Sequence, residues 1–169
     1  MAQRKIPETI TEKELQELIK KVKFNHQKLA YALGFYQCMR VSEVVNLKPE
    51  HIDYGRKLIM IKQAKGKKDR NIPIAPEVLR GLKFLPIQVG VRALQYSFSK
   101  YSQEVLNRHL NFHTLRHSGA THYLNVKKWS TRQVQVFLGH SRLDTTQIYT
   151  HVNPEDLVNI MWNDTEKAK

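Results

Sequence analysis

His140 and Tyr149, near the carboxyl end of the chain, are the first residues whose types and spacing could carry chemistry. Tyr149 follows His140 by nine residues, and the preceding Gly139 is typical of a helix end. A tyrosine hydroxyl has an ordinary pKa of about 10, so it is a good nucleophile only where neighbouring groups remove its proton or stabilise its anion. Taken singly, such a tyrosine usually packs and such a histidine usually caps a helix or faces solvent. A reactive Tyr149 therefore requires activating groups elsewhere in the chain.

Arg40 is a candidate for binding an anion. It lies between an apolar segment, 33–39, and a predicted short helix. An arginine in apolar surroundings usually has an anionic partner. The sequence leaves two partners open: a bound phosphate group, or the carboxylate of Glu43 three residues later.

His113, Arg116 and His117 lie on one predicted helix. His113 and Arg116 share a face, because residues three apart are neighbours on a helix, and together they could bind a phosphate. The two histidines are also four residues apart, as in zinc-binding helices. However, Thr114 stands where such helices carry a glutamate, and the charge of Arg116 would repel a cation. A zinc site is therefore less favoured than an anion site or an ordinary polar helix face.

The segment 64–69 is polar and basic, and it is flanked by two strand-like runs. Gly66 permits a tight turn, so the pattern predicts a β-hairpin with a basic tip that could reach into a nucleic-acid groove. Any one of these cations taken alone is more often a solvated surface charge. The cations at and beside the tip are Lys65, Lys67, Lys68 and Arg70.

The composition favours a polyanionic partner. The chain has 169 residues, a formal net charge of +13 and 41% hydrophobic residues, which suffice for a buried core. A protein this basic usually binds nucleic acid, although a ribosome-like or membrane-surface role is the alternative. Cys38 is the single cysteine, which excludes a disulfide framework and suits a reducing, cytoplasmic compartment. The sequence shows neither a signal peptide nor a membrane-spanning stretch.

Several elements must position these residues. Thr11 opens a helix over 12–22 with a capping box, and Asn25 is expected to cap the second helix. Strands are expected over 57–63 and 71–74, with Pro73 marking a sheet edge. The other predicted helices are 40–47, 76–82, 91–109, 113–124, one from the Ser130 capping box to 138, a short one capped by Asp144 that carries Tyr149, and a last one opened by Pro154.

This pattern predicts an α+β fold that is mainly helical, with one small antiparallel sheet. No linker rich in glycine and serine divides the chain, so a single domain is expected. Its expected parts are an entry arm over 1–10, the domain itself over 11–162 and a polar tail over 163–169.

The candidate residues occur in recognisable motifs. Arg-x-Ser-Glu begins at Arg40, a Lys-Gly pair lies in the hairpin, and His-x-Leu-Arg-His begins at His113. Leu-Gly-His-Ser-x-x-x-Thr-Thr-x-x-Tyr ends at Tyr149. From about Thr11 to Val152 the chain resembles the catalytic domain of tyrosine recombinases, the phage-integrase and Xer-type family. The last two motifs are highly specific, and the hairpin is much less so.

The resemblance implies a site-specific DNA recombinase or integrase that cleaves and rejoins strands through a covalent 3′-phosphotyrosyl intermediate, without metal, ATP or another cofactor. Tyr149 is the implied nucleophile, and Glu43 is expected to orient Arg40 rather than react. The remaining implied roles are phosphate binding by Arg40, Arg116 and His140, a general acid at Lys65, and proton transfer with Tyr149 at His113.

The resemblance also implies double-stranded DNA as partner, contacted by Lys67, Lys68 and Arg70, with a homotetramer on DNA and a monomer in isolation. The N-terminal core-binding domain of such proteins is absent from this chain, so weak and salt-sensitive DNA binding is expected. Where the family often has Thr-Gly-Leu before the first arginine, this chain has Gln37-Cys38-Met39. The alternatives are a type IB topoisomerase-like nicking-closing enzyme and a DNA-binding regulator without a covalent step.

Overall fold

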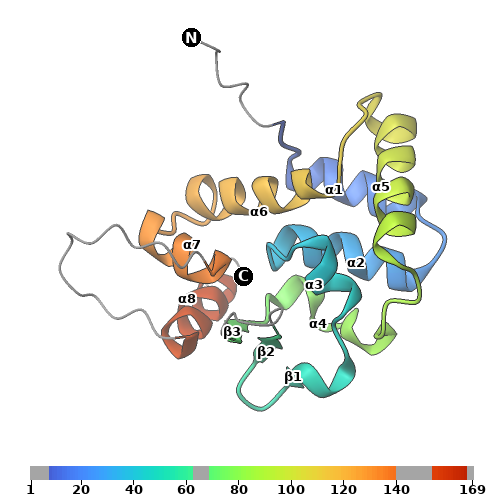
Figure 1. Ribbon diagram of the computed structural model, residues 1–169. Coiled ribbons are helices and arrows are strands. Elements are labelled where there is room, and N and C mark those ends of the chain that lie inside the picture. Colours follow the sequence, from blue (N-terminus) through green and yellow to red (C-terminus); the bar gives the residue numbers. More distant parts are fainter. Residues whose placement is uncertain (1–7, 63–68, 140–153, 167–169) are drawn as a thin grey trace, which may run out of the picture.

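The computed structural model describes residues 8–62, 69–139 and 154–166, with side chains to 163 in the last helix. It confirms a mainly helical α+β fold with one small antiparallel sheet (Figure 1). The α-helices are α1 (Glu12–Lys21), α2 (Asn25–Tyr36), α3 (Val41–Val45), α4 (Pro76–Leu79), α5 (Val91–Leu106), α6 (His113–Asn125), α7 (Thr131–Leu138) and α8 (Pro154–Glu166). Short 3₁₀ turns occur at η1 (Pro49–His51) and η2 (Leu82–Phe84).

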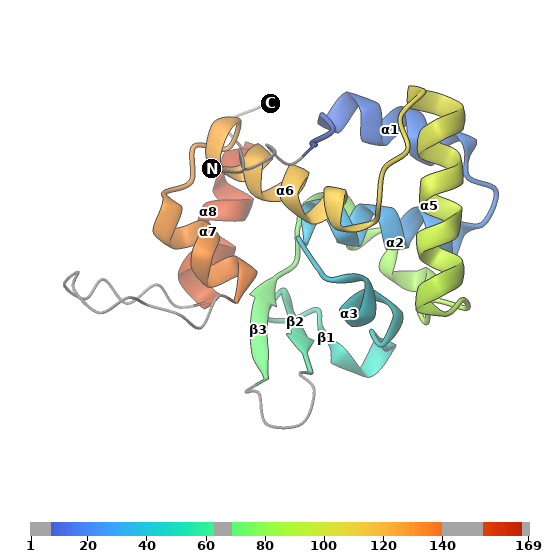
Figure 2. The same cartoon turned by 45° about the horizontal axis from the view of Figure 1, so that its top comes forward.

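Helix α2 forms the centre of the core. Every residue from Leu29 to Tyr36 is buried, so the helix is enclosed on all sides over that length. It packs against α6, α4, α3 and α1, and α5 crosses over α1 and packs against it (Figures 1 and 2). The segment that carries Arg40 directly follows the end of α2, so the site begins at the edge of the most buried element.

Local capping signals explain several helix ends. The Thr11 hydroxyl accepts a hydrogen bond from the Glu14 amide, and Ser130 does the same for Gln133, so both predicted capping boxes are confirmed. Gly139 ends α7 with φ +69°, the left-handed conformation that favours glycine. Pro76 and Pro154 each open a helix, as predicted.

Some predicted ends are wrong. Asn25 is the first residue of α2 rather than its cap: Phe24 holds the cap position without a side-chain hydrogen bond. Helix α5 ends at Leu106, because Asn107 adopts a left-handed conformation with φ 53°. Helices α3 and α4 are shorter than predicted, and α8 continues to Glu166, into the segment predicted as a polar tail. Ile10, in the predicted loose arm, is buried and its amide donates to Ser118 Oγ.

The sheet has the order β1-β2-β3, with β1 (Ile52–Asp53), β2 (Leu58–Ile61) and β3 (Arg70–Pro73) all antiparallel. The hairpin of β2 and β3 is confirmed, and Pro73 does lie on an edge strand. The sequence did not predict β1, which is too short to show alternation. Ile61 pairs with Arg70, the last pair of this hairpin among the described residues, and Lys65 falls between these two residues in the sequence.

Helix α8 lies beside α7 and covers β3 (Figure 2). Trp162 Nε1 donates to the Ile74 carbonyl oxygen at 3.0 Å, and Lys57 Nζ lies 3.8 Å from the centre of the Trp162 ring. Among the described residues, no helix combines the length and apolar character needed to cross a membrane.

Candidate active site

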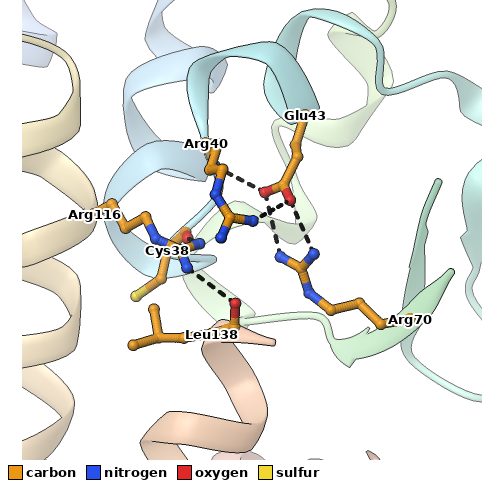
Figure 3. Close-up of polar contacts among 6 residues, drawn as sticks. All are labelled: Cys38, Arg40, Glu43, Arg70, Arg116 and Leu138. Carbon is orange, nitrogen blue, oxygen red and sulfur yellow. Dashed lines mark hydrogen bonds and ion pairs between the residues drawn. The ribbon is translucent and has the colours of Figure 1, made fainter. Parts of the chain in front are cut away.

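Arg116 is the most deeply placed of the candidate residues that the structure describes. It lies on α6 with 4% of its surface exposed. Its guanidinium donates one hydrogen bond to the Cys38 carbonyl oxygen and another, of 2.9 Å, to the Leu138 carbonyl oxygen (Figure 3). Cys38 precedes Arg40 by two residues, and Leu138 precedes His140 by two. Arg116 therefore connects the chain segments that lead to two other candidate residues.

The close approach of α6 to α2 depends on Gly119. A Cβ atom at this position would overlap the carbonyl oxygen of Phe35 and lie 2.7 Å from Cys38 Sγ. Cys38 itself has φ 49°, a left-handed conformation that glycine adopts at little cost. Cys38 stands where the family pattern Thr-Gly-Leu has glycine. It adopts the left-handed backbone conformation that a glycine would, and its side chain lies beside Gly119.

Gln37 connects the turn between α2 and α3 to the end of β3. Its buried amide donates to the Pro73 carbonyl oxygen at 2.8 Å and accepts from the Ala75 amide at 2.9 Å. Pro73 is the last residue of β3, and Ala75 directly precedes α4. The backbone before Arg40 is thus fixed on one side by Gln37 and on the other by Arg116.

Arg40 caps α3 and pairs with Glu43. Arg40 Nη1 lies 3.0 Å from Glu43 Oε1, and the Arg40 amide donates to Glu43 Oε2 at 2.8 Å. The Arg40 side chain is 41% exposed and that of Glu43 only 7%. The salt bridge left open by the sequence is therefore present, yet the guanidinium also has a solvent-facing side on which an anion can bind.

Arg70 makes a bidentate ion pair with the Glu43 carboxylate. Its Nη1 lies 2.9 Å from Glu43 Oε1 and its Nη2 3.2 Å from Oε2, with 14% of the side chain exposed (Figure 3). The sequence placed Arg70 among the DNA contacts of the hairpin. In the structure it lies at the base of the hairpin, and its guanidinium binds within the protein.

The charges of this cluster act on one another. Burial, together with the charge of Arg40, lowers the pKa of Arg116 to about 10. Burial would raise the pKa of Glu43, but hydrogen bonds from Arg70 and from the Arg40 amide outweigh it and lower that pKa below 4.5. Arg116 and Arg40 are thus close enough to repel, which is typical of a site prepared for an anion.

His113 stands on the first turn of α6, beside this cluster. Partial burial lowers its pKa, and the charges of His117, Arg116 and Arg40 act in the same direction. The rings of His113 and His117 lie 4.5 Å apart, centre to centre. In the described ranges no group of three or more histidine, cysteine, aspartate or glutamate side chains could hold a metal ion.

The structure brings Arg40, Glu43, Arg70, Arg116 and His113 together. Sequence reasoning missed the backbone partners of Arg116 and the second arginine on Glu43. The one available signal was the position of Arg70 next to a strand rather than in the hairpin tip. Five predicted site residues lie outside the described residues: Lys65, Lys67, Lys68, His140 and Tyr149.

Comparison with known proteins defines the class. The model of the phage integrase family matches residues 8–97 and 86–156, which is most of the chain. The chain belongs to the phage integrase family, the tyrosine recombinases. The resemblance of its motifs to that family is thereby confirmed.

Individual relatives and solved structures are consistent with this family. The tyrosine recombinase XerA of Thermococcus onnurineus is 32% identical over 173 residues, which cover 90% of this chain and 61% of that protein. The integrase of mycobacterium phage Brujita has the same fold, with a TM-score of 0.79 at 19% identity over 95% of this chain and 59% of its own. XerH recombinase bound to palindromic difH substrate has a TM-score of 0.67 at 19% identity. The match covers 97% of this chain and 52% of the XerH chain. The chain thus spans about three fifths of the curated relative.

Proposed function

We propose that this chain is the catalytic domain of a site-specific DNA recombinase that cleaves and rejoins strands through a 3′-phosphotyrosyl intermediate. One observation carries the proposal: the guanidinium groups of Arg40 and Arg116, which are remote in sequence, lie close together (Figure 3), and the charges of both act on His113. Two like charges gathered at a partly exposed place fit the non-bridging oxygens of a phosphodiester. Family membership supplies the reaction class.

The proposed reaction balances without an outside reagent. The hydroxyl oxygen of Tyr149 forms a bond to phosphorus while the bond from phosphorus to the 5′ oxygen breaks. His113 accepts the tyrosine proton, and its lowered pKa suits this role because the ring is neutral near pH 7. Lys65 donates a proton to the departing 5′ oxygen. Arg40, Arg116 and His140 hold the phosphate oxygens, and Arg116 keeps its charge because guanidinium pKa values stay high.

Rejoining reverses these steps. The 5′-hydroxyl of another strand attacks the phosphotyrosyl bond and restores both a phosphodiester and the free tyrosine. The energy of the broken bond is kept in the phosphotyrosyl ester, so the proposed reaction needs neither ATP nor a metal ion. The solvent-exposed side of Arg40 gives the phosphate a route of access.

Double-stranded DNA is the proposed partner, in keeping with the net charge of +13 and the cytoplasmic setting expected from the sequence. The XerH structure bound to its difH substrate supports this partner by analogy of fold. Lys67 and Lys68 are the proposed phosphate contacts of the hairpin. We also propose a homotetramer on DNA and a monomer without it, with salt-sensitive binding by the chain alone.

A trapping experiment tests the proposal. The 169-residue chain is incubated with a nicked suicide duplex in EDTA, and adducts that survive SDS are sought. We expect an adduct with the unmodified chain and none with Tyr149→Phe, whereas the control variant Tyr101→Phe, on α5, should leave it intact. An adduct that persists in Tyr149→Phe contradicts the assigned nucleophile.

Product analysis separates the related activities. Recombinant junctions between two duplexes indicate a recombinase, whereas relaxed circles alone indicate a nicking-closing enzyme. Binding without any adduct indicates a DNA-binding regulator. A loss of adduct in EDTA that added Mg²⁺ restores would contradict the metal-free mechanism.

A further inference from the structure

We propose that Arg70 is a positioning residue of this site, which fixes Arg40 and the end of α7 relative to each other. The inference rests on the proposed function, because its consequence is a rate of strand cleavage. It assigns to Arg70 a role different from the DNA contact that its sequence position indicates.

The first observation is the shared carboxylate. Glu43 uses Oε1 for both Arg40 and Arg70, and its Oε2 accepts from the Arg40 amide and from Arg70 Nη2. The planar fork of Arg70 therefore sets the orientation of the carboxylate plane, and the carboxylate sets the position of Arg40. Exposure separates their roles: 41% of the Arg40 side chain is exposed but only 14% of that of Arg70.

The second observation is the contact of Arg70 with the end of α7. A Cβ atom added to Gly139 would lie 2.6 Å from both Cδ and Nε of Arg70 and 3.0 Å from its Cζ. Arg70 therefore packs directly against the residue that precedes His140. Arg116 binds the neighbouring Leu138 carbonyl oxygen. The last turn of α7 is thus held by one arginine on its backbone and by another at its glycine.

The third observation is the position of Arg70 in the chain. It is the first residue of β3, paired with Ile61, so it closes the base of the hairpin that carries Lys65. Arg70 thus begins the strand that follows the Lys65 segment, and its side chain binds the carboxylate that holds Arg40 and packs against the residue that precedes His140. A displacement of about 1 Å at such groups can lower a rate about 100-fold.

Arg70→Lys and Arg70→Gln test this role, with single-turnover cleavage of the suicide duplex measured at saturating DNA. Lysine keeps one charge and the aliphatic stem beside Gly139 but loses the fork. For both variants we expect cleavage to slow by about 10- to 100-fold, with the DNA dissociation constant changed less than about 3-fold. The slope of binding against salt should be unchanged.

A direct phosphate contact predicts the opposite pattern. Arg70→Gln would then weaken DNA binding and reduce the salt slope by about one, while the rate at saturating DNA stayed the same. That result, or an unchanged rate and affinity, overturns the proposal. A merely structural role would lower the unfolding midpoint but leave the saturated rate of the folded protein unchanged, which also overturns it. If Arg70→Gln does not fold, the rate of Arg70→Lys decides alone.

Arg56→Gln is the matched control. Arg56 also pairs with a glutamate, Glu155, at 2.6 Å, but both side chains are largely exposed. The same substitution there should leave the cleavage rate within about 2-fold of the unmodified chain, because exposed pairs contribute little.

A double-variant cycle tests whether Arg70 acts through Arg40. If it does, Arg40→Lys with Arg70→Lys should be no more than about 3-fold slower than Arg40→Lys alone. Fully multiplicative losses would contradict coupling through Arg40. If the unmodified chain forms no adduct at all, the proposed function fails. If it forms one and Arg70→Lys matches its rate, only this inference fails.

Discussion

Arg116 donates a hydrogen bond of 2.9 Å to the carbonyl oxygen of Leu138, the residue two before His140. The same guanidinium binds the carbonyl oxygen of Cys38. A side chain expected from the sequence only to bind phosphate therefore also joins two backbone segments. A substitution of Arg116 should therefore lower both the stability of the domain and the proposed catalytic activity.

Arg116→Lys should lower the free energy of unfolding by about 1–3 kcal/mol, because a single ammonium cannot serve both carbonyl oxygens in the same geometry. Urea denaturation measures this loss, and adduct formation should fall in parallel. Arg108→Lys is the control, since Arg108 also donates to a backbone carbonyl, that of Thr9, but at a more exposed place. A stable Arg116→Lys variant would show that the two carbonyl bonds contribute little.

Gly119→Ala should destabilise the domain by about 3 kcal/mol or more, because the added methyl group would overlap the Phe35 carbonyl oxygen. The helices α2 and α6 would have to separate in the middle of the core. Gly55→Ala provides the control, since its nearest contact would be Asp53 Oδ1 at an ordinary 3.5 Å. Equal denaturation midpoints for the two variants would rule out a close helix contact at Gly119.

The thiol of Cys38 should react slowly in the native protein. It is fully buried, and burial raises its pKa to about 12, although the charge of Arg116 acts in the opposite direction. We expect alkylation by iodoacetamide at pH 7.5 to be at least about 100-fold slower than in urea. Because the chain has no other cysteine, mass spectrometry reports on this site alone. Rapid native alkylation would reveal local opening just before Arg40.

Stability should fall as the pH drops below about 6.5, partly because of His122. Burial lowers its pKa from the ordinary value of 6.5, with the charge of Glu12 opposing and that of Lys127 adding to the shift. The unfolded chain therefore takes up this proton at a higher pH than the folded one, so the free energy of unfolding decreases from pH 6.5 down to the folded pKa. Above pH 6.5 this group has no effect on stability.

Urea midpoints at pH 7.5 and 5.5 check this expectation. His122→Gln should reduce the difference between the two midpoints, whereas His109→Gln, at an exposed position, serves as the control for the loss of a histidine. An unchanged difference in His122→Gln would assign the acid sensitivity to other groups.

Local signals made much of the fold predictable. The capping boxes at Thr11 and Ser130, the helix-opening prolines and the glycine after α7 act over three or four residues, so they can be identified without knowing the tertiary structure. Asn25 shows the limit of such signals, because α2 starts one residue earlier than the cap chemistry of Asn25 favoured.

The sequence predicted which residues form the candidate site, but it did not predict most of the hydrogen bonds and ion pairs between them. The motifs identify Arg40, Glu43 and Arg116 because their types and order are distinctive. The pairing of Arg70 with Glu43 joins residues 27 apart in sequence, and the Leu138 carbonyl lies 22 residues from its donor. No periodicity encodes such contacts, because they arise only when α3, β3 and α7 pack together.

The gathering of Arg40, Arg70 and Arg116 near Glu43 should couple folding to the proposed binding of a phosphodiester. In the described part of the chain, Arg40 and Arg70 share this carboxylate and the charge of Arg116 lies close enough to act on theirs, so the mutual repulsion of the three guanidinium groups opposes the compact state. A phosphodiester bound as proposed would relieve this repulsion and thereby stabilise the whole domain, not only the bound strand. Resistance to heat in the presence of DNA should then measure occupancy of the site.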